Sequence, residues 1–74
     1  MKKEYSYDIY NDLGRVQGGN LTEEAYNEAL KRTDIELVQE WETDYKEEIT
    51  YGKQYKVGKD YRLFIWKKVF KESE

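Results

Sequence analysis

Hydrophobic and polar residues alternate strictly near the start of the chain. Residues 4–10 place one set of side chains on the apolar side of an extended chain, namely Tyr5, Tyr7 and Ile9. The other side would carry Glu4, Ser6, Asp8 and Tyr10. This period of two predicts a half-buried strand. Asn11-Asp12-Leu13-Gly14 follows, and its residue types favour a turn.

Residues 61–70 form the densest apolar run, and the rest of the chain is predicted to be organised around it. The run is rich in aromatic and β-branched residues and contains no Gly or Pro, which favours a long interior strand. In that strand Leu63 and Ile65 would point to one side and Phe64 and Trp66 to the other. A helix remains an alternative, because Leu63, Trp66 and Phe70 also fall near one helical face.

A helix is predicted at about residues 22–32. Thr22 is a suitable N-cap, and Glu23 and Glu24 lie in the first turn, where the helix dipole favours anions. Leu21 and Tyr26 have the spacing of a hydrophobic staple. The apolar stripe is narrow and consists of Ala25, Tyr26, Ala29 and Leu30, which favours close packing on a sheet.

Residues 35–45 fit two patterns. As a strand, one face would carry Ile35, Leu37, Gln39, Trp41, Thr43 and Tyr45, and the other Glu36, Val38, Glu40, Glu42 and Asp44. As a helix, the apolar stripe would be Leu37, Val38, Trp41, Tyr45 and Ile49, after a segment that resembles a capping box. We favour the strand, because the alternation holds over more positions and a second helix would follow the first too closely.

The remaining segments complete a small sheet. Residues 15–17 return briefly as a strand before Gly18-Gly19 breaks the pattern, and residues 46–48 turn. Residues 49–57 form a strand interrupted near Gly52, and Gly58-Lys59-Asp60 is a hairpin connection. The tail, residues 71–74, is expected to fray. The prediction is a single α+β domain over residues 1–74, with one helix packed on an antiparallel sheet of about four strands.

Composition adds limits to this fold. A chain of 74 residues has a thin core, but 12 aromatic residues supply large buried areas. The sequence has no Cys, which fits a reducing compartment, and we expect a cytoplasmic protein. Its start lacks the apolar stretch of a secretory signal, and no apolar run is long enough to span a bilayer, so no membrane partner is expected.

The candidate chemistry is sparse. The chain has neither His nor Cys, which removes the usual general base, nucleophile pairs and zinc ligands. We therefore predict that it is not an enzyme and needs no metal or cofactor. Gly14 to Asn20 has the glycine spacing of a phosphate-binding loop, but Asn20 stands where that loop needs lysine. Asp8 to Asp12 resembles a calcium loop with Tyr10 at a ligand position. Both are interpreted as turns.

Charge is divided unevenly along the chain, whose net charge is −3. Residues 1–50 carry 6 basic and 13 acidic side chains, whereas residues 51–74 carry 7 basic and 3 acidic ones. The simplest interpretation is that acidic and basic strands pair across the sheet, which would leave the charge without a role in binding.

A more specific interpretation starts from the acidic strand. Alternate residues on one strand face repeat at about 6.8 Å, so Glu36, Glu40, Glu42 and Asp44 would form a row that matches roughly every second phosphate of a nucleic-acid strand. This pattern predicts a small acidic inhibitor that mimics nucleic acid and occupies the basic groove of a partner protein, such as a nuclease or another nucleic-acid enzyme. The predicted partner-binding residues are Glu36, Glu40, Glu42, Asp44, Tyr45, Glu47 and Glu48.

A competing interpretation uses the other end of the chain. Basic and aromatic residues interleave there, as in proteins that bind single-stranded nucleic acid. The candidate residues are Lys53, Tyr55, Lys56, Lys59, Arg62, Lys67 and Lys68. The isoelectric point near 5.0 disfavours this function, and Phe64 and Trp66 are expected in the core. Exposed sheet edges also offer a route to homo-oligomers.

Overall fold

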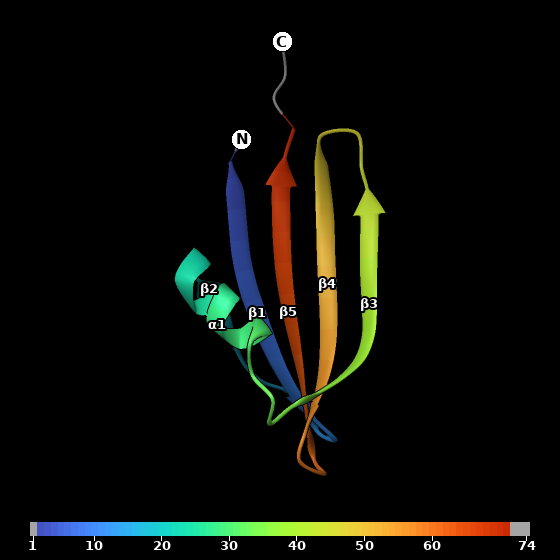
Figure 1. Ribbon diagram of the computed structural model, residues 1–74. Helices are drawn as coiled ribbons and strands as arrows, with labels where there is room; N and C mark the ends of the chain where they lie inside the picture. Colours follow the sequence, from blue (N-terminus) through green and yellow to red (C-terminus); the bar gives the residue numbers. More distant parts are fainter. Residues whose placement is uncertain (1, 72–74) are drawn as a thin grey trace.

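The computed structural model describes residues 2–71 and confirms the α+β class (Figure 1). The elements in chain order are β1 (Lys3–Asn11), β2 (Gly14–Leu21), α1 (Glu23–Leu30), β3 (Glu36–Asp44), β4 (Glu48–Val57) and β5 (Tyr61–Phe70). The strands form one sheet in the order β2-β1-β5-β4-β3, and all neighbouring pairs are antiparallel. The sheet therefore has five strands, and the predicted number of four is wrong.

Strand β5 lies at the centre of the sheet, which confirms the predicted interior strand over residues 61–70 and excludes the helical alternative. Leu63 and Ile65 point to one face and are only 8% and 2% exposed. Phe64 and Trp66 point to the other face, as their alternation predicts. Both faces of the sheet thus carry large apolar side chains at its middle.

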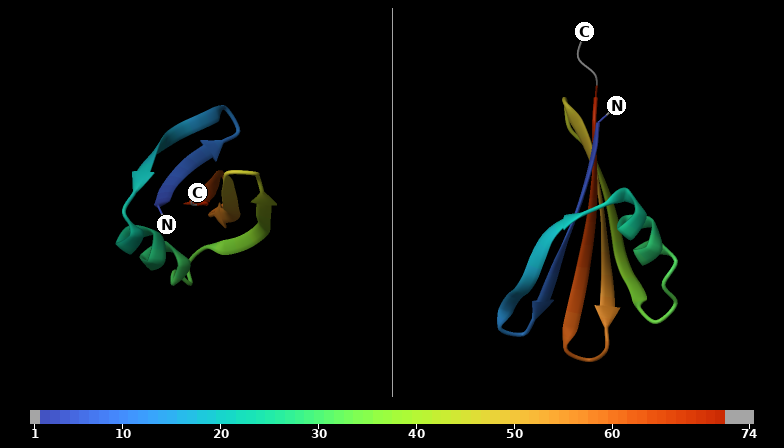
Figure 2. Two further views of the ribbon diagram at one scale, coloured as in Figure 1. Left: turned by 90° about the horizontal axis from the view of Figure 1, so that it is seen from above. Right: turned by 90° about the vertical axis from the view of Figure 1, so that its left-hand side faces the viewer.

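Helix α1 covers only one face of the sheet, called the helix side here; the other is called the open face (Figure 2). Thr22 caps the helix as predicted, and its Oγ1 accepts a hydrogen bond of 3.0 Å from the Ala25 backbone N–H. Tyr26 projects from the helix into the core, where its ring lies 4.7 Å from that of Tyr5. The buried hydrophobic core of the described residues is small and consists of Tyr26, Tyr55, Leu63 and Ile65.

The first strand follows its sequence pattern. Tyr5, Tyr7 and Ile9 lie on the helix side, where they pack against the core. The turn after the strand is also confirmed, because the Asn11 Oδ1 accepts a hydrogen bond of 2.8 Å from the Leu13 backbone N–H. Residues 8–11 belong to β1, so the interpretation of Asp8 to Asp12 as a turn is wrong for these four residues. Within that segment only Asp12 lies in the turn.

The prediction that Gly18-Gly19 ends the second strand is wrong. Strand β2 continues through both glycines to Leu21, so residues 14–20 are neither a loop nor a flexible turn. The structure gives a reason for Gly18, whose cross-strand partner is Asp8. A Cβ at residue 18 would overlap the Arg15 guanidinium and the Asp8 carboxylate, which form an ion pair with Nε–Oδ1 at 3.0 Å. Glycine here makes room for that pair without interrupting the strand.

Residues 36–44 form a strand, as favoured, but the predicted division of their faces is wrong. A bulge between Leu37 and Gln39 inserts Val38 as an extra residue against β4. An extra residue reverses the alternation beyond it. Leu37 therefore faces the helix side, whereas Trp41 lies on the open face opposite Gly52.

The last strands differ from prediction in two details. Strand β4 runs from Glu48 to Val57 without an interruption at Gly52. The predicted hairpin connection after it is confirmed, and Gly58 adopts a positive φ of 63°. Lys71 is not frayed, because its backbone N–H donates to the Glu47 carbonyl at 2.9 Å. Glu72 to Glu74 lie outside the described residues.

No helix among residues 2–71 is long and apolar enough to cross a membrane.

We expect Ile65→Asp to remove most of the stability of the fold. Ile65 is the most buried residue of the core, and an unpaired carboxylate there costs several kcal/mol, about as much as a small domain has to lose. Chemical denaturation of the wild type and the variant measures this loss. Val38→Asp is the matched control, because Val38 is 55% exposed at the bulge and should change stability by less than about 0.5 kcal/mol. A cooperative, wild-type melting curve for Ile65→Asp would contradict the central position of β5.

We also expect stability to fall in alkaline solution. Burial raises the pKa of the Tyr26 hydroxyl above its ordinary value. The unfolded chain therefore releases this proton at lower pH than the folded one, and stability declines as pH rises through the ordinary tyrosine pKa. In Tyr26→Phe this part of the decline should be absent. The free energies of unfolding of the wild type and the variant, measured from neutral to alkaline pH, show the difference. Identical pH dependences would contradict the assignment.

Candidate functional site

The structure divides the predicted row of carboxylates. Glu40, Glu42 and Asp44 lie together on the helix side of β3, where they oppose Lys53, Tyr51 and Ile49 of β4. Glu36 precedes the bulge and lies on the open face opposite Lys56. The bulge at Val38 causes this separation, because it changes the face of every residue after it. A continuous row of four carboxylates therefore does not form.

Two of the three remaining carboxylates are paired within the chain. The Lys53 ammonium binds the Glu40 carboxylate, and this hydrogen bond raises the lysine pKa above its ordinary value. Lys71 binds the Asp44 carboxylate and also donates to the Tyr45 carbonyl at 2.9 Å. These ion pairs follow the simple interpretation, in which acidic and basic residues pair across the sheet.

The other predicted partner-binding residues lie near the turn between β3 and β4. Tyr45 is 53% exposed there, and Glu47 follows it in the turn. Glu48 begins β4 on the open face, where its Oε2 lies 4.0 Å from the Lys68 Nζ. The predicted set thus occupies two faces and one turn, so it does not form one surface.

The basic residues of the competing prediction are also divided. Lys56, Arg62 and Lys68 lie on the open face, and Lys59 lies in the turn between β4 and β5. Lys53 and Lys67 lie on the helix side, where Tyr55 is part of the buried core. The residues that interleave in the sequence are therefore divided between the two faces of the sheet, and each face carries both basic and aromatic side chains.

The open face instead gathers aromatic residues that the sequence analysis did not bring together. Four rings from three strands meet there, called the aromatic cluster: Tyr10, Trp41, Phe64 and Trp66. The rings of Trp41, Phe64 and Trp66 are nearly parallel, with centroids 5.9 to 6.1 Å apart. Phe64 and Trp66 are half-buried by these contacts but lie outside the core under the helix, so the prediction that they are core residues is wrong.

Gly52 makes the middle of this cluster possible. It is the cross-strand partner of both Trp41 and Trp66, so the two indoles approach it from opposite sides. A Cβ at residue 52 would lie 2.5 Å from Trp66 Cζ3 and 2.9 Å from Trp41 Cε3. The sequence did contain this signal, because a glycine inside a strand often marks a close approach rather than an interruption.

Polar groups fix one border of the cluster. The Asp8 carboxylate accepts hydrogen bonds from Trp66 Nε1 at 3.3 Å and from Arg15 Nε at 3.0 Å. Arg62 donates to the Asn11 carbonyl at 3.3 Å. Between these groups lies a shallow hollow of about 250 Å³, which is lined by Asp8, Tyr10, Arg62, Phe64 and Trp66. The border thus has both an acidic and a basic group beside aromatic walls.

The charges of the open face nearly balance. Its acidic strand residues are Glu4, Asp8, Glu36 and Glu48, and its basic ones are Arg15, Lys56, Arg62 and Lys68. Lys2, which precedes β1, adds one positive charge beside Glu4 and Phe70. A nearly neutral face with aromatic residues at its centre resembles the core and rim of a protein–protein interface.

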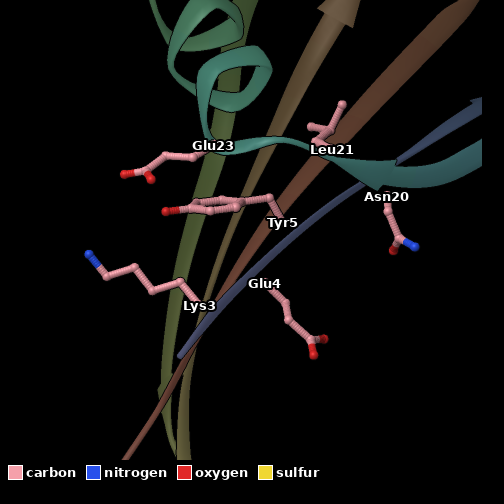
Figure 3. Close-up of a pocket in the computed structure, with 6 residues that line it drawn as sticks. All are labelled: Lys3, Glu4, Tyr5, Asn20, Leu21 and Glu23. Atoms are coloured by element: carbon pink, nitrogen blue, oxygen red, sulfur yellow. The ribbon is translucent and has the colours of Figure 1, made fainter. Parts of the chain in front are cut away.

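A second hollow, of about 740 Å³, lies beside the start of α1 (Figure 3). Its lining residues are Lys3, Glu4, Tyr5, Asn20, Leu21 and Glu23. Figure 3 shows Lys3, Tyr5 and Glu23 directed to one side and Glu4 and Asn20 to another, so these side chains do not converge on one ligand. Within residues 2–71, no group of three or more acidic side chains is placed to hold a metal ion.

No known protein family matches the sequence, and no curated protein or solved structure is significantly similar to it. A proposal for the function of this protein therefore rests on its own sequence and on the surface described above.

We expect Gly52→Ala to disturb the aromatic cluster selectively. The added methyl group must displace the two indoles, which costs about 1–3 kcal/mol and changes the fluorescence and near-ultraviolet circular dichroism of Trp41 and Trp66. Gly19→Ala is the matched control in β2, because its Cβ would be at an ordinary contact distance of 3.6 Å from Tyr7 Cε1. Equal spectra and equal stability for the two variants would show that Gly52 does not hold the cluster in place.

Proposed function

We propose that this protein is a non-catalytic protein-binding module and that its docking surface is the open face of the sheet. The observation that supports this proposal is the aromatic cluster around Gly52, on a face that α1 does not cover. Tryptophan and tyrosine supply most of the binding energy at many protein interfaces, and they cluster near the interface centre. Here Trp41 and Trp66 occupy the middle of the face.

The charge of the open face favours a protein partner over nucleic acid. A surface for single-stranded nucleic acid combines aromatic rings with a positive groove along the backbone path. The open face has rings but no strong positive charge, since four of its basic residues are matched by four acidic ones and Lys2 adds a single positive charge. The non-catalytic part of the proposal rests on the sequence, which has neither His nor Cys. We place this binding in the cytoplasm, as predicted from the sequence.

Acidic mimicry of nucleic acid is the second candidate. Its support is that Glu40, Glu42 and Asp44 share one face of β3, which is an edge strand. A basic groove on a nucleic-acid enzyme would have to compete with Lys53 and Lys71 for two of these carboxylates. This competition reduces the electrostatic gain, so the open face is the stronger candidate.

Affinity capture from a lysate of the source organism separates the two candidates. The proposal predicts that the tagged wild-type protein retains a discrete protein partner and that Trp41→Ala loses it. The aromatic side chain at the interface centre is expected to contribute about 2 kcal/mol or more, roughly a thirtyfold change in affinity. Direct titration of the purified partner against both forms then measures this change.

Two control variants define the alternatives. Tyr61→Ala removes an aromatic side chain that is exposed on the helix side beside Leu63, and it should bind as the wild type does. Glu40→Lys combined with Glu42→Lys should also bind normally. Loss of the partner by this double reversal, with binding by Trp41→Ala intact, would instead favour acidic mimicry. Recovery of RNA or DNA in place of a protein would favour the nucleic-acid-binding alternative.

A further inference from the structure

We propose that a second copy of this chain covers the open face, so that two sheets pack face to face with the aromatic clusters at the centre. This inference rests on the proposed function, because it names an occupant for the same surface. The two helices would then lie on the outside, giving four layers in the order helix, sheet, sheet, helix.

The exposed area of the chain is large for its mass. A compact monomer of 9.0 kDa exposes about 4,900 Å². This chain exposes 5753 Å², an excess of about 900 Å² over that expectation. Each partner in a protein interface of standard size buries about 800 Å². The excess is therefore of the size that one such interface would remove.

The core on the helix side is correspondingly small. Among residues 2–71, the buried apolar side chains are only Tyr26, Tyr55, Leu63 and Ile65, whereas the two tryptophans remain half-buried on the open face. Short chains often gain the missing burial by oligomerisation. A second aromatic cluster placed against the first would double the apolar layer at the point where this chain has its largest side chains.

The strand register shows how charges are arranged along the open face. Near the turn between β4 and β5, one row across the sheet carries the basic residues Arg15, Arg62 and Lys56. Tyr10 separates the two arginines, and Glu36 lies opposite Lys56. Near the other end lie Glu4, Glu48 and Lys68, and Lys2 adds a positive charge there, 3.5 Å from Glu4. Trp41, Gly52 and Trp66 form one row between these ends. The face therefore has an aromatic middle between two ends of mixed charge, and the end near the turn between β4 and β5 is the more basic one.

This arrangement is self-complementary when the strands of the two copies run in opposite directions. A two-fold axis across the strands at the Trp41–Gly52–Trp66 row would place the two ends of the face over each other. Lys56 would then face Glu48 of the second copy, and this pair would occur twice because of the symmetry. Glu4 would lie over Asp8 of the second copy, but Arg15 already offsets the Asp8 charge within its own chain through an ion pair of 3.0 Å. An axis parallel to the strands would instead place Arg62 over Arg62 and Lys68 over Lys68, which like-charge repulsion disfavours.

Sedimentation velocity over a range of micromolar concentrations tests the inference. The expected result is a monomer–dimer equilibrium in the wild type, with blue-shifted tryptophan fluorescence in the dimer. Trp41→Ala should shift the equilibrium toward the monomer. Val16→Ala is the control, since Val16 is an exposed apolar residue of β2 that lies on the helix side with Ile9 and Leu63, away from the aromatic cluster.

A charge reversal tests the orientation. Lys56→Glu alone and Glu48→Lys alone should each weaken the dimer roughly tenfold, because each creates two like-charge pairs. The double variant should recover most of the wild-type dissociation constant. Lys56 and Glu48 lie at opposite ends of β4, so the effects of the two substitutions within one chain should add. Recovery of affinity in the double variant therefore identifies a contact between the two copies.

A wild-type protein that stays monomeric at all concentrations would overturn the inference. So would a dimer that Trp41→Ala leaves intact, which would indicate pairing through the edge strands, or single reversals that the double variant does not correct. A monomer that still captures a partner in a Trp41-dependent manner would overturn only this inference and leave the proposed function standing. A monomer without any such partner would overturn both.

Discussion

The packing of β5 determines the rest of this structure. The strand lies between β1 and β4 at the centre of the sheet and carries large apolar side chains on both faces. One helix of eight residues covers one of these faces, through Tyr26. The chain has no second helix among its described residues to cover the other. The half-buried rings on the open face are thus a direct result of a two-sided central strand in a two-layer domain.

Features set by neighbouring residues could be predicted from the sequence. Thr22 and the acidic first turn located the helix, and the period of two located β1 and assigned the faces of β5. The errors arose where pairing between distant segments decides the outcome. The bulge at Val38 depends on how β3 aligns with β4, and Gly18 keeps β2 extended because the pair between Arg15 and Asp8 fills its space. No local pattern contains this information.

The aromatic cluster on the open face could not be predicted from the sequence for the same reason. Each of its aromatic residues was visible in the sequence, but Tyr10, Trp41 and Phe64 come from three strands whose order and register bring them together. The carboxylate row failed for the same reason, since Lys53 and Lys71 reach Glu40 and Asp44 only in the folded sheet. Gly52 was the one local signal for the aromatic cluster, and its meaning depends on the indoles that flank it.

The strand order also has a consequence for how the chain assembles. Strands β1 and β2 form one hairpin, and β3, β4 and β5 form a continuous meander. The strands within each of these two units are joined by short loops and can pair with one another without the other unit. Only the seam between β1 and β5 joins segments from opposite ends of the chain, and it closes last on loop-entropy grounds. The molecule is in this sense two contiguous fragments, separated by the segment between α1 and β3. One line of backbone hydrogen bonds between β1 and β5 joins them, together with the core contacts of Tyr26. A chain cut in that segment would retain every strand pairing, and its two pieces could reassemble by closing the same seam.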